Sequence, residues 1–140
     1  MPYVINRVTS QINFEFQAGL RARNMTLTHW RVLAFLTETD GLGVSALADY
    51  TVTPQSTLSR ALQQMERLGL VERSGEAEDN RLVQIHITAR GRSLFSEILP
   101  LALKLRDRAL AGLSVTEQQT LLKLLRRVLI NFGDKTDRAM

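Results

Sequence analysis

The hydrophobic pattern of this 140-residue chain changes its period at Gly69. Before that glycine, apolar residues recur every three or four positions, as they do along one face of an amphipathic helix. After it, Val83, Ile85 and Ile87 alternate with polar residues, which is the pattern of a half-buried strand. The helical period returns after Thr88. The sequence therefore predicts a mainly α fold that contains one small β-hairpin.

Capping residues and glycines divide the helical parts into six predicted helices. The first runs over residues 3–20, the second begins at a cap at Thr28 and the third at a cap at Ser45. The fourth runs from Thr53 and Pro54 to Leu68, and the fifth from Thr88 to the region of Gly112 with a kink at Pro100. The sixth runs from a capping box at Ser114 and Glu117 to Phe132. Residues 70–73 and 82–87 are predicted to form the hairpin, because the acidic segment between them is rich in turn residues.

The order of these elements contains a winged helix-turn-helix over residues 28–88, within a single domain of residues 1–140. The flanking helices, in residues 1–22 and 89–133, carry more apolar residues than one small central unit can cover. Pairing with a second copy about a two-fold axis would bury these residues. We therefore expect a homodimer in which the flanking helices are the dimerisation helices.

The composition removes several classes of chemistry. The chain has no cysteine, which excludes disulfides, thiolate metal sites and cysteine nucleophiles. Its two histidines, His29 and His86, have no partner at metal-binding or catalytic spacing, and both are expected at the surface. No phosphate-binding glycine loop, membrane-crossing apolar run or signal peptide is present. The sequence therefore predicts no enzyme, no metal, no cofactor, no membrane partner and a cytoplasmic location.

The predicted helix from Pro54 to Leu68 has two chemically distinct faces. Its apolar stripe is formed by Leu58, Ala61, Leu62, Met65 and Leu68. Its other face offers hydroxyl, amide and guanidinium groups and no acid before Glu66, from Gln55, Ser56, Thr57, Ser59, Arg60, Gln63 and Gln64. Such groups read base edges and phosphates in DNA. A solvated face that merely lacks acids is the alternative, but the preceding turn and the following hairpin favour DNA recognition.

The tip of the predicted hairpin contains Asp79 and Arg81. An aspartate two residues before an arginine can hold the guanidinium in one orientation, and an oriented arginine can enter a narrow minor groove. The alternative is a surface salt bridge that contributes less than about 1 kcal/mol. The position at the tip of a wing favours the DNA contact.

Several segments resemble the signature of the MarR (multiple-antibiotic-resistance regulator) family of bacterial transcription factors. In the second half these are Leu70-Val71-Glu72-Arg73, Asp79-Asn80-Arg81 and Ile87-Thr88-Ala89-Arg90-Gly91. Upstream they are Leu27-Thr28, Trp30-Arg31-Val32-Leu33 and Ser56-Thr57-Leu58-Ser59-Arg60. The match extends over nearly the whole chain in order and spacing, although Ile87 stands where the family often has leucine.

The resemblance implies a homodimer built from the first and last helices, which binds double-stranded DNA. It places Gln55, Ser56, Thr57, Ser59 and Arg60 against the DNA in the major groove, with Arg81 in the minor groove and Asp79 as its orienting partner. On this basis we expect a sequence-specific transcriptional regulator, a repressor acting on a pseudo-palindromic operator. A winged-helix protein-interaction module without DNA binding is the alternative function.

The resemblance also implies an effector, because family members commonly release DNA when a small phenolic or aromatic acid binds between the dimer helices and the winged domain. Other members sense peroxides through cysteine, which this chain lacks. Phe14, Trp30 and Arg31 are the candidate ligand-binding residues, and Arg7, Arg21 and Arg23 are also available. Core packing for Trp30, and solvated or intersubunit positions for the arginines, are the alternatives.

Overall fold

The computed structural model describes residues 1–75 and 83–134. In these residues the elements are α1 (Pro2–Arg21), α2 (Leu27–Glu38), β1 (Leu42–Gly43), α3 (Val44–Thr51), α4 (Gln55–Arg67), β2 (Val71–Ser74), β3 (Gln84–Ile87), α5 (Ala89–Ala109) and α6 (Val115–Asn131). The mainly α fold with a small antiparallel hairpin is thereby confirmed. The predicted wing tip, with Asp79 and Arg81, lies outside the described residues.

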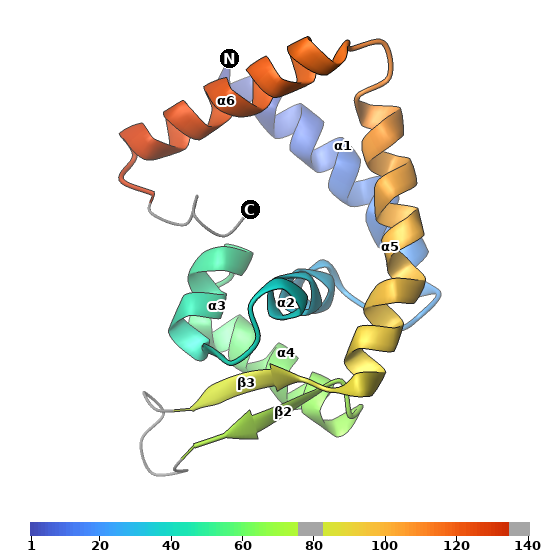
Figure 1. Ribbon diagram of the computed structural model, residues 1–140, viewed down its shortest axis with the longest axis vertical. Helices are drawn as coiled ribbons and strands as arrows, with labels where there is room; N and C mark the ends of the chain where they lie inside the picture. The colour runs from blue at the N-terminus through green and yellow to red at the C-terminus, as the bar shows by residue number, and fades with distance from the viewer. Residues whose placement is uncertain (76–82, 135–140) are drawn as a thin grey trace.

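The helices and the sheet form two parts that α5 connects (Figure 1). Helices α2, α3 and α4 lie with the sheet in one part, which has the order of a winged helix-turn-helix. Helix α5 leads from the end of β3 to the other part, where α6 turns back from the end of α5 and overlaps the start of α1 in this view. Helix α6 buries none of its residues.

The sheet has the order β1-β3-β2, and both pairings are antiparallel. In the hairpin, Val71 lies opposite Ile87 and Ser74 lies opposite Gln84. Strand β1 was not predicted, because its two residues are too few to show an alternating pattern. The Asp40 carboxylate extends this edge, since its Oδ1 accepts a 2.8 Å hydrogen bond from the backbone N–H of Ile87.

The hydrophobic core lies mainly in the winged part. Buried residues of α2, α3, α4 and the sheet form one cluster, which α1 joins through Phe16 and Leu20 and α5 joins through Ile98. The alternation predicted for β3 is confirmed, because Val83, Ile85 and Ile87 are all buried. The core therefore fixes α1 and α5 to the winged part, but it leaves α6 outside.

Two of the predicted helix caps are confirmed. Thr88 accepts a hydrogen bond from the Gly91 backbone N–H, and Ser114 forms a capping box with Glu117, as predicted. Three other starts differ. Thr26, not Thr28, caps α2; α3 begins at Val44 without a side-chain cap from Ser45; and Pro54, not Thr53, precedes α4. The Thr53 hydroxyl instead donates to the Thr51 carbonyl at 3.1 Å.

His29 is buried, with 1% of its surface exposed, so its predicted surface position is wrong. The reason is the cap of α2, a reciprocal pair in which Nδ1 of His29 accepts a hydrogen bond from the Thr26 backbone N–H at 3.3 Å. The Thr26 hydroxyl in turn accepts from the His29 backbone N–H at 3.2 Å. Burial lowers the pKa of His29 below its usual value of 6.5.

The free energy of unfolding is therefore expected to fall as the pH drops below about 6.5. The unfolded chain takes up a proton at the ordinary histidine pKa, whereas the folded chain does so only at lower pH, so the unfolded state binds more protons in this window. One such group changes the free energy by at most about 1.4 kcal/mol per pH unit.

Urea titrations at about pH 7.5 and about pH 5.5 measure this change. His29→Gln should flatten the dependence, because a glutamine side chain takes up no proton in this range. An equal pH dependence in wild type and His29→Gln would contradict the assignment to His29.

Candidate nucleic-acid interface and ligand cavity

Helix α4 packs through the face that its sequence predicts. Leu58, Leu62 and Met65 are fully buried and Ala61 is 9% exposed, whereas Leu68 is 39% exposed at the end of the helix. This packing fixes the rotation of α4, so its polar side is turned outward by the core and not by the polar residues themselves.

The outward side of α4 presents most of the predicted DNA-contacting residues. Gln55, Ser56, Thr57, Arg60 and Gln63 are exposed, and Ser59 is half-buried. The first turn of α4 contains no acidic residue. The N-terminal end of a helix carries a partial positive charge and free backbone N–H groups, so this end of α4 favours an anion such as phosphate.

Two side chains of this surface differ in how firmly they are held. The Gln55 amide donates a 3.0 Å hydrogen bond to the Ser45 hydroxyl, which connects the start of α4 to α3. Arg60 has no carboxylate within ion-pair distance in the parts of the chain that the structure describes. Its guanidinium is therefore available for a phosphate or for the two acceptors of a guanine edge.

A polar cluster holds the base of the wing. His86 of β3 lies with Nε2 2.9 Å from the Ser74 hydroxyl and Nδ1 3.4 Å from Oδ2 of Asp40. Arg92 lies 3.9 Å from the same carboxylate oxygen. Burial alone would raise the pKa of Asp40, but hydrogen bonds from the Ile87 and Gly41 backbone and from His86 bring it below the usual value. His86 is half-buried and connects the sheet to the segment between α2 and β1.

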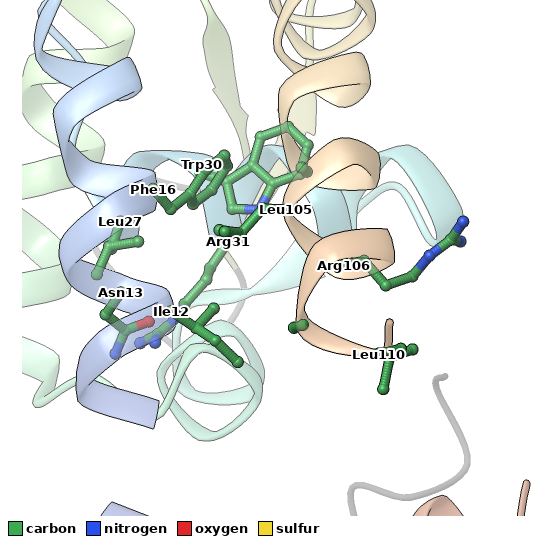
Figure 2. A pocket seen from close by; sticks show the side chains of 11 residues that line it. Ile12, Asn13, Phe16, Leu27, Trp30, Arg31, Leu105, Arg106 and Leu110 are labelled. Atoms are coloured by element: carbon green, nitrogen blue, oxygen red, sulfur yellow. The ribbon is translucent and has the colours of Figure 1, made fainter. Parts of the chain in front are cut away.

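A cavity of about 370 Å³ lies between α1, α2 and α5 (Figure 2). It is lined by Ile12, Asn13, Phe16, Leu27, Trp30, Arg31, Ala102, Leu105, Arg106, Ala109 and Leu110. Most of this lining is apolar, and the polar side chains are one amide and two guanidinium groups. A concave, mainly apolar site with a few polar groups is typical of small-molecule binding.

The structure brings two of the three predicted ligand residues to this cavity. Trp30 and Arg31 line it, whereas Phe14 does not and is 70% exposed. Phe16 is the aromatic residue that α1 contributes, and its ring packs edge-on against Trp30 with the ring centroids 5.3 Å apart. Trp30 also stacks on Phe95 at 4.9 Å, so it both packs against the core and faces the cavity. Phe16 could have been found from the apolar stripe of the first helix, to which Phe14 does not belong.

In residues 1–75 and 83–134, no three metal-ligating side chains come together. No helix in these ranges is long and apolar enough to cross a membrane.

An exposed apolar surface covers α6 and the start of α1. On α6 it comprises Val115, Leu121, Leu122, Leu124, Leu125, Leu129 and Ile130, followed by Phe132. On α1 it comprises Tyr3, Val4, Ile5 and Val8. A surface of this kind in a folded protein indicates an interaction with another protein or with a second copy.

Comparisons with known proteins agree with this architecture. The sequence model of the MarR family matches residues 23–82. A solved MarR-family transcriptional regulator from Silicibacter pomeroyi is 32% identical, has a TM-score of 0.85, and the match covers 93% of this chain and 88% of that chain. The HTH-type transcriptional repressor Rv2887 of Mycobacterium tuberculosis is 28% identical over 127 residues, which cover 90% of this chain and 91% of the repressor. The structure of Rv2887 in complex with salicylic acid is 25% identical, with a TM-score of 0.71 and coverage of 91% and 95%.

Proposed function

Because the chain belongs to the MarR family of transcriptional regulators, we propose that it is a ligand-responsive repressor that binds operator DNA as a homodimer. The observation that carries the proposal is the outward side of α4, which is polar, acid-free in its first turn and fixed by a buried stripe. Relatives named transcriptional repressors support the direction of regulation.

In this proposal α4 enters the major groove, and residues 28–88 form the DNA-binding region. Gln55, Arg60 and Gln63 reach base edges or phosphates, together with the hydroxyl groups of Ser56, Thr57 and Ser59. Arg81 enters the minor groove with Asp79 as its partner. Two copies joined through residues 1–22 and 89–133 place two such helices on one pseudo-palindrome, with half-sites about one helical turn apart. The proposal includes a cytoplasmic location, where a bacterial regulator meets its operator.

The proposed effector is a small aromatic acid that binds in the cavity between α1, α2 and α5. The aromatic rings of Phe16 and Trp30 suit a flat apolar ligand, and Arg31 suits a carboxylate. The complex of the relative Rv2887 with salicylic acid supports this class of ligand. Such an effector binds the dimer more tightly at one spacing of the two α4 helices than at the other. The ratio of these two affinities sets the largest change in operator affinity that the effector can cause.

Removing a base contact of α4 is expected to change which operator the protein prefers. Arg60→Ala and Gln55→Ala should each lower discrimination between operator variants by about 1 to 3 kcal/mol, because a bidentate contact to one base is lost. Fluorescence competition between the operator and single-base variants measures this discrimination.

Lys104→Ala is the matched control, since it also removes an exposed side chain but lies on α5. It should leave the order of preference unchanged. An equal loss of affinity for every sequence in Arg60→Ala would limit that residue to a phosphate contact, and no loss in either α4 variant would refute the proposed interface.

A further inference from the structure

The guanidinium of Arg31 connects the ligand cavity to the turn before α4. Arg31 lines the cavity from α2, and its Nη1 donates a 3.2 Å hydrogen bond to the backbone carbonyl of Thr51. Thr51 is the last residue of α3 and is fully buried. One side chain therefore faces a ligand site and also supports the helix-turn-helix.

The turn after Thr51 needs such support. Val52 has a φ of 51°, in the left-handed region that a β-branched residue enters only at a cost. The last carbonyl groups of a helix have no partner within the helix. The Thr51 carbonyl instead accepts hydrogen bonds from Arg31 and from the Thr53 hydroxyl. Only a few residues separate Thr51 from the first residue of α4, Gln55, so the conformation of this turn determines the position of α4 relative to α3.

Arg31 is also the cavity cation that is available to an anion. The other cavity arginine, Arg106, forms an ion pair with Asp107 at 2.7 Å. No carboxylate of the described residues lies within ion-pair distance of Arg31, whose partner is a neutral carbonyl. A carboxylate accepts a stronger hydrogen bond from a guanidinium than a neutral carbonyl does. The guanidinium has five N–H donors, so an aromatic acid in the cavity can bind the same group and pull it toward the cavity, away from Thr51.

We propose that Arg31 transmits ligand binding to α4. An aromatic carboxylate that binds the guanidinium draws it away from the Thr51 carbonyl, and the α3–α4 turn loosens. This coupling between the cavity and the α3–α4 turn rests on the proposed function, because it would be the step by which the effector regulates DNA binding. It requires the ligand to be an anion, because a neutral molecule of the same shape can fill the cavity without displacing the hydrogen bond.

The free protein, without DNA, provides the direct test. Trp30 is the single tryptophan of the chain and lines the cavity, so its fluorescence reports binding of salicylate. The backbone N–H groups of Val52 and Thr53 donate to carbonyls of α3, so their hydrogen exchange reports the turn. Saturating salicylate should increase this exchange several-fold, whereas salicylamide, its neutral analogue, should leave it unchanged.

Substitutions of Arg31 should affect both salicylate binding and hydrogen exchange at the α3–α4 turn, and the two effects can be measured separately. Arg31→Met retains the length of the side chain without its charge. It should show raised exchange at the turn before any ligand is added, no further increase with salicylate, and salicylate binding weakened about 10- to 100-fold. Arg31→Lys, which restores the charge, should bind salicylate more tightly than Arg31→Met. Lys104→Met, at an exposed position of α5 outside the cavity lining, is the control and should respond as the wild type does.

The outcomes distinguish this coupling from the proposed function. Unchanged exchange of Val52 and Thr53, both in Arg31→Met and in salicylate-loaded wild type, would overturn the coupling whether or not DNA is bound. An absence of salicylate binding to the wild type would overturn the ligand class. Wild-type protein that shows the exchange response but retains no DNA would instead refute the proposed function and leave the coupling in place.

Discussion

Replacing Leu125 and Leu129 of α6 by glutamate is expected to lower operator affinity by about 10²- to 10⁴-fold. Both leucines are exposed and lie four residues apart, so they share one face of the helix. In the proposed homodimer this face is covered by the partner, and two buried carboxylates without partners would separate the subunits. Each monomer would then bind one half-site without the gain in effective concentration that the linked copy supplies.

A matched control is available on the same helix. Thr116 and Thr120 are exposed and lie on the side of α6 opposite Leu125, so replacing both by glutamate adds the same charge to the other side. Sedimentation velocity and fluorescence anisotropy with operator DNA measure assembly and affinity together. The leucine variant should sediment as a monomer, and the threonine variant as a dimer. Monomeric wild-type protein that binds the operator tightly would contradict the dimer.

Gly91→Ala, at the start of α5, should destabilise the fold strongly. A Cβ at this position would lie 2.2 Å from the backbone carbonyl oxygen of Leu70 and 2.8 Å from a side-chain carbon of Ile87. A backbone oxygen cannot swing aside as a side chain can, so the start of α5 must move away from the sheet. Overpacking of this kind costs about 1 to 3 kcal/mol, and we expect the upper end of that range.

Gly43→Ala is the control for this prediction. Gly43 has a φ of -70°, and the nearest atom to its added Cβ would be the Val83 carbonyl oxygen at 3.9 Å. That substitution should be neutral or slightly stabilising. Urea denaturation measures both variants. Equal stability of Gly91→Ala and wild type would show that α5 can shift at no cost, against the close packing described here.

Local signals in the sequence account for most of the fold. The stripe of α4, the alternation of Val83, Ile85 and Ile87, and the caps at Thr88 and Ser114 all involve residues close together in the chain. The errors arise where a contact overrides such a signal. Thr28 is a good capping residue, but Thr26 is selected because His29 can complete a reciprocal pair with it.

The cavity was less predictable for the same reason. Its walls come from α1, α2 and α5, and no local pattern shows how closely three helices approach one another. Phe14 of the first helix was a candidate ligand residue, but the packing of α1 leaves it exposed. The contact from Arg31 to the Thr51 carbonyl was also out of reach, because a backbone acceptor 20 residues away leaves no trace in side-chain identity.

The most direct test of a DNA-binding homodimer is selection of bound fragments from a random pool of double-stranded DNA at two salt concentrations. We expect enrichment of a pseudo-palindrome whose half-site centres lie about 10 base pairs apart, with affinity that falls linearly on a log–log plot against salt. Failure to retain any DNA at the lower salt concentration would contradict the account and favour a winged-helix protein-interaction module.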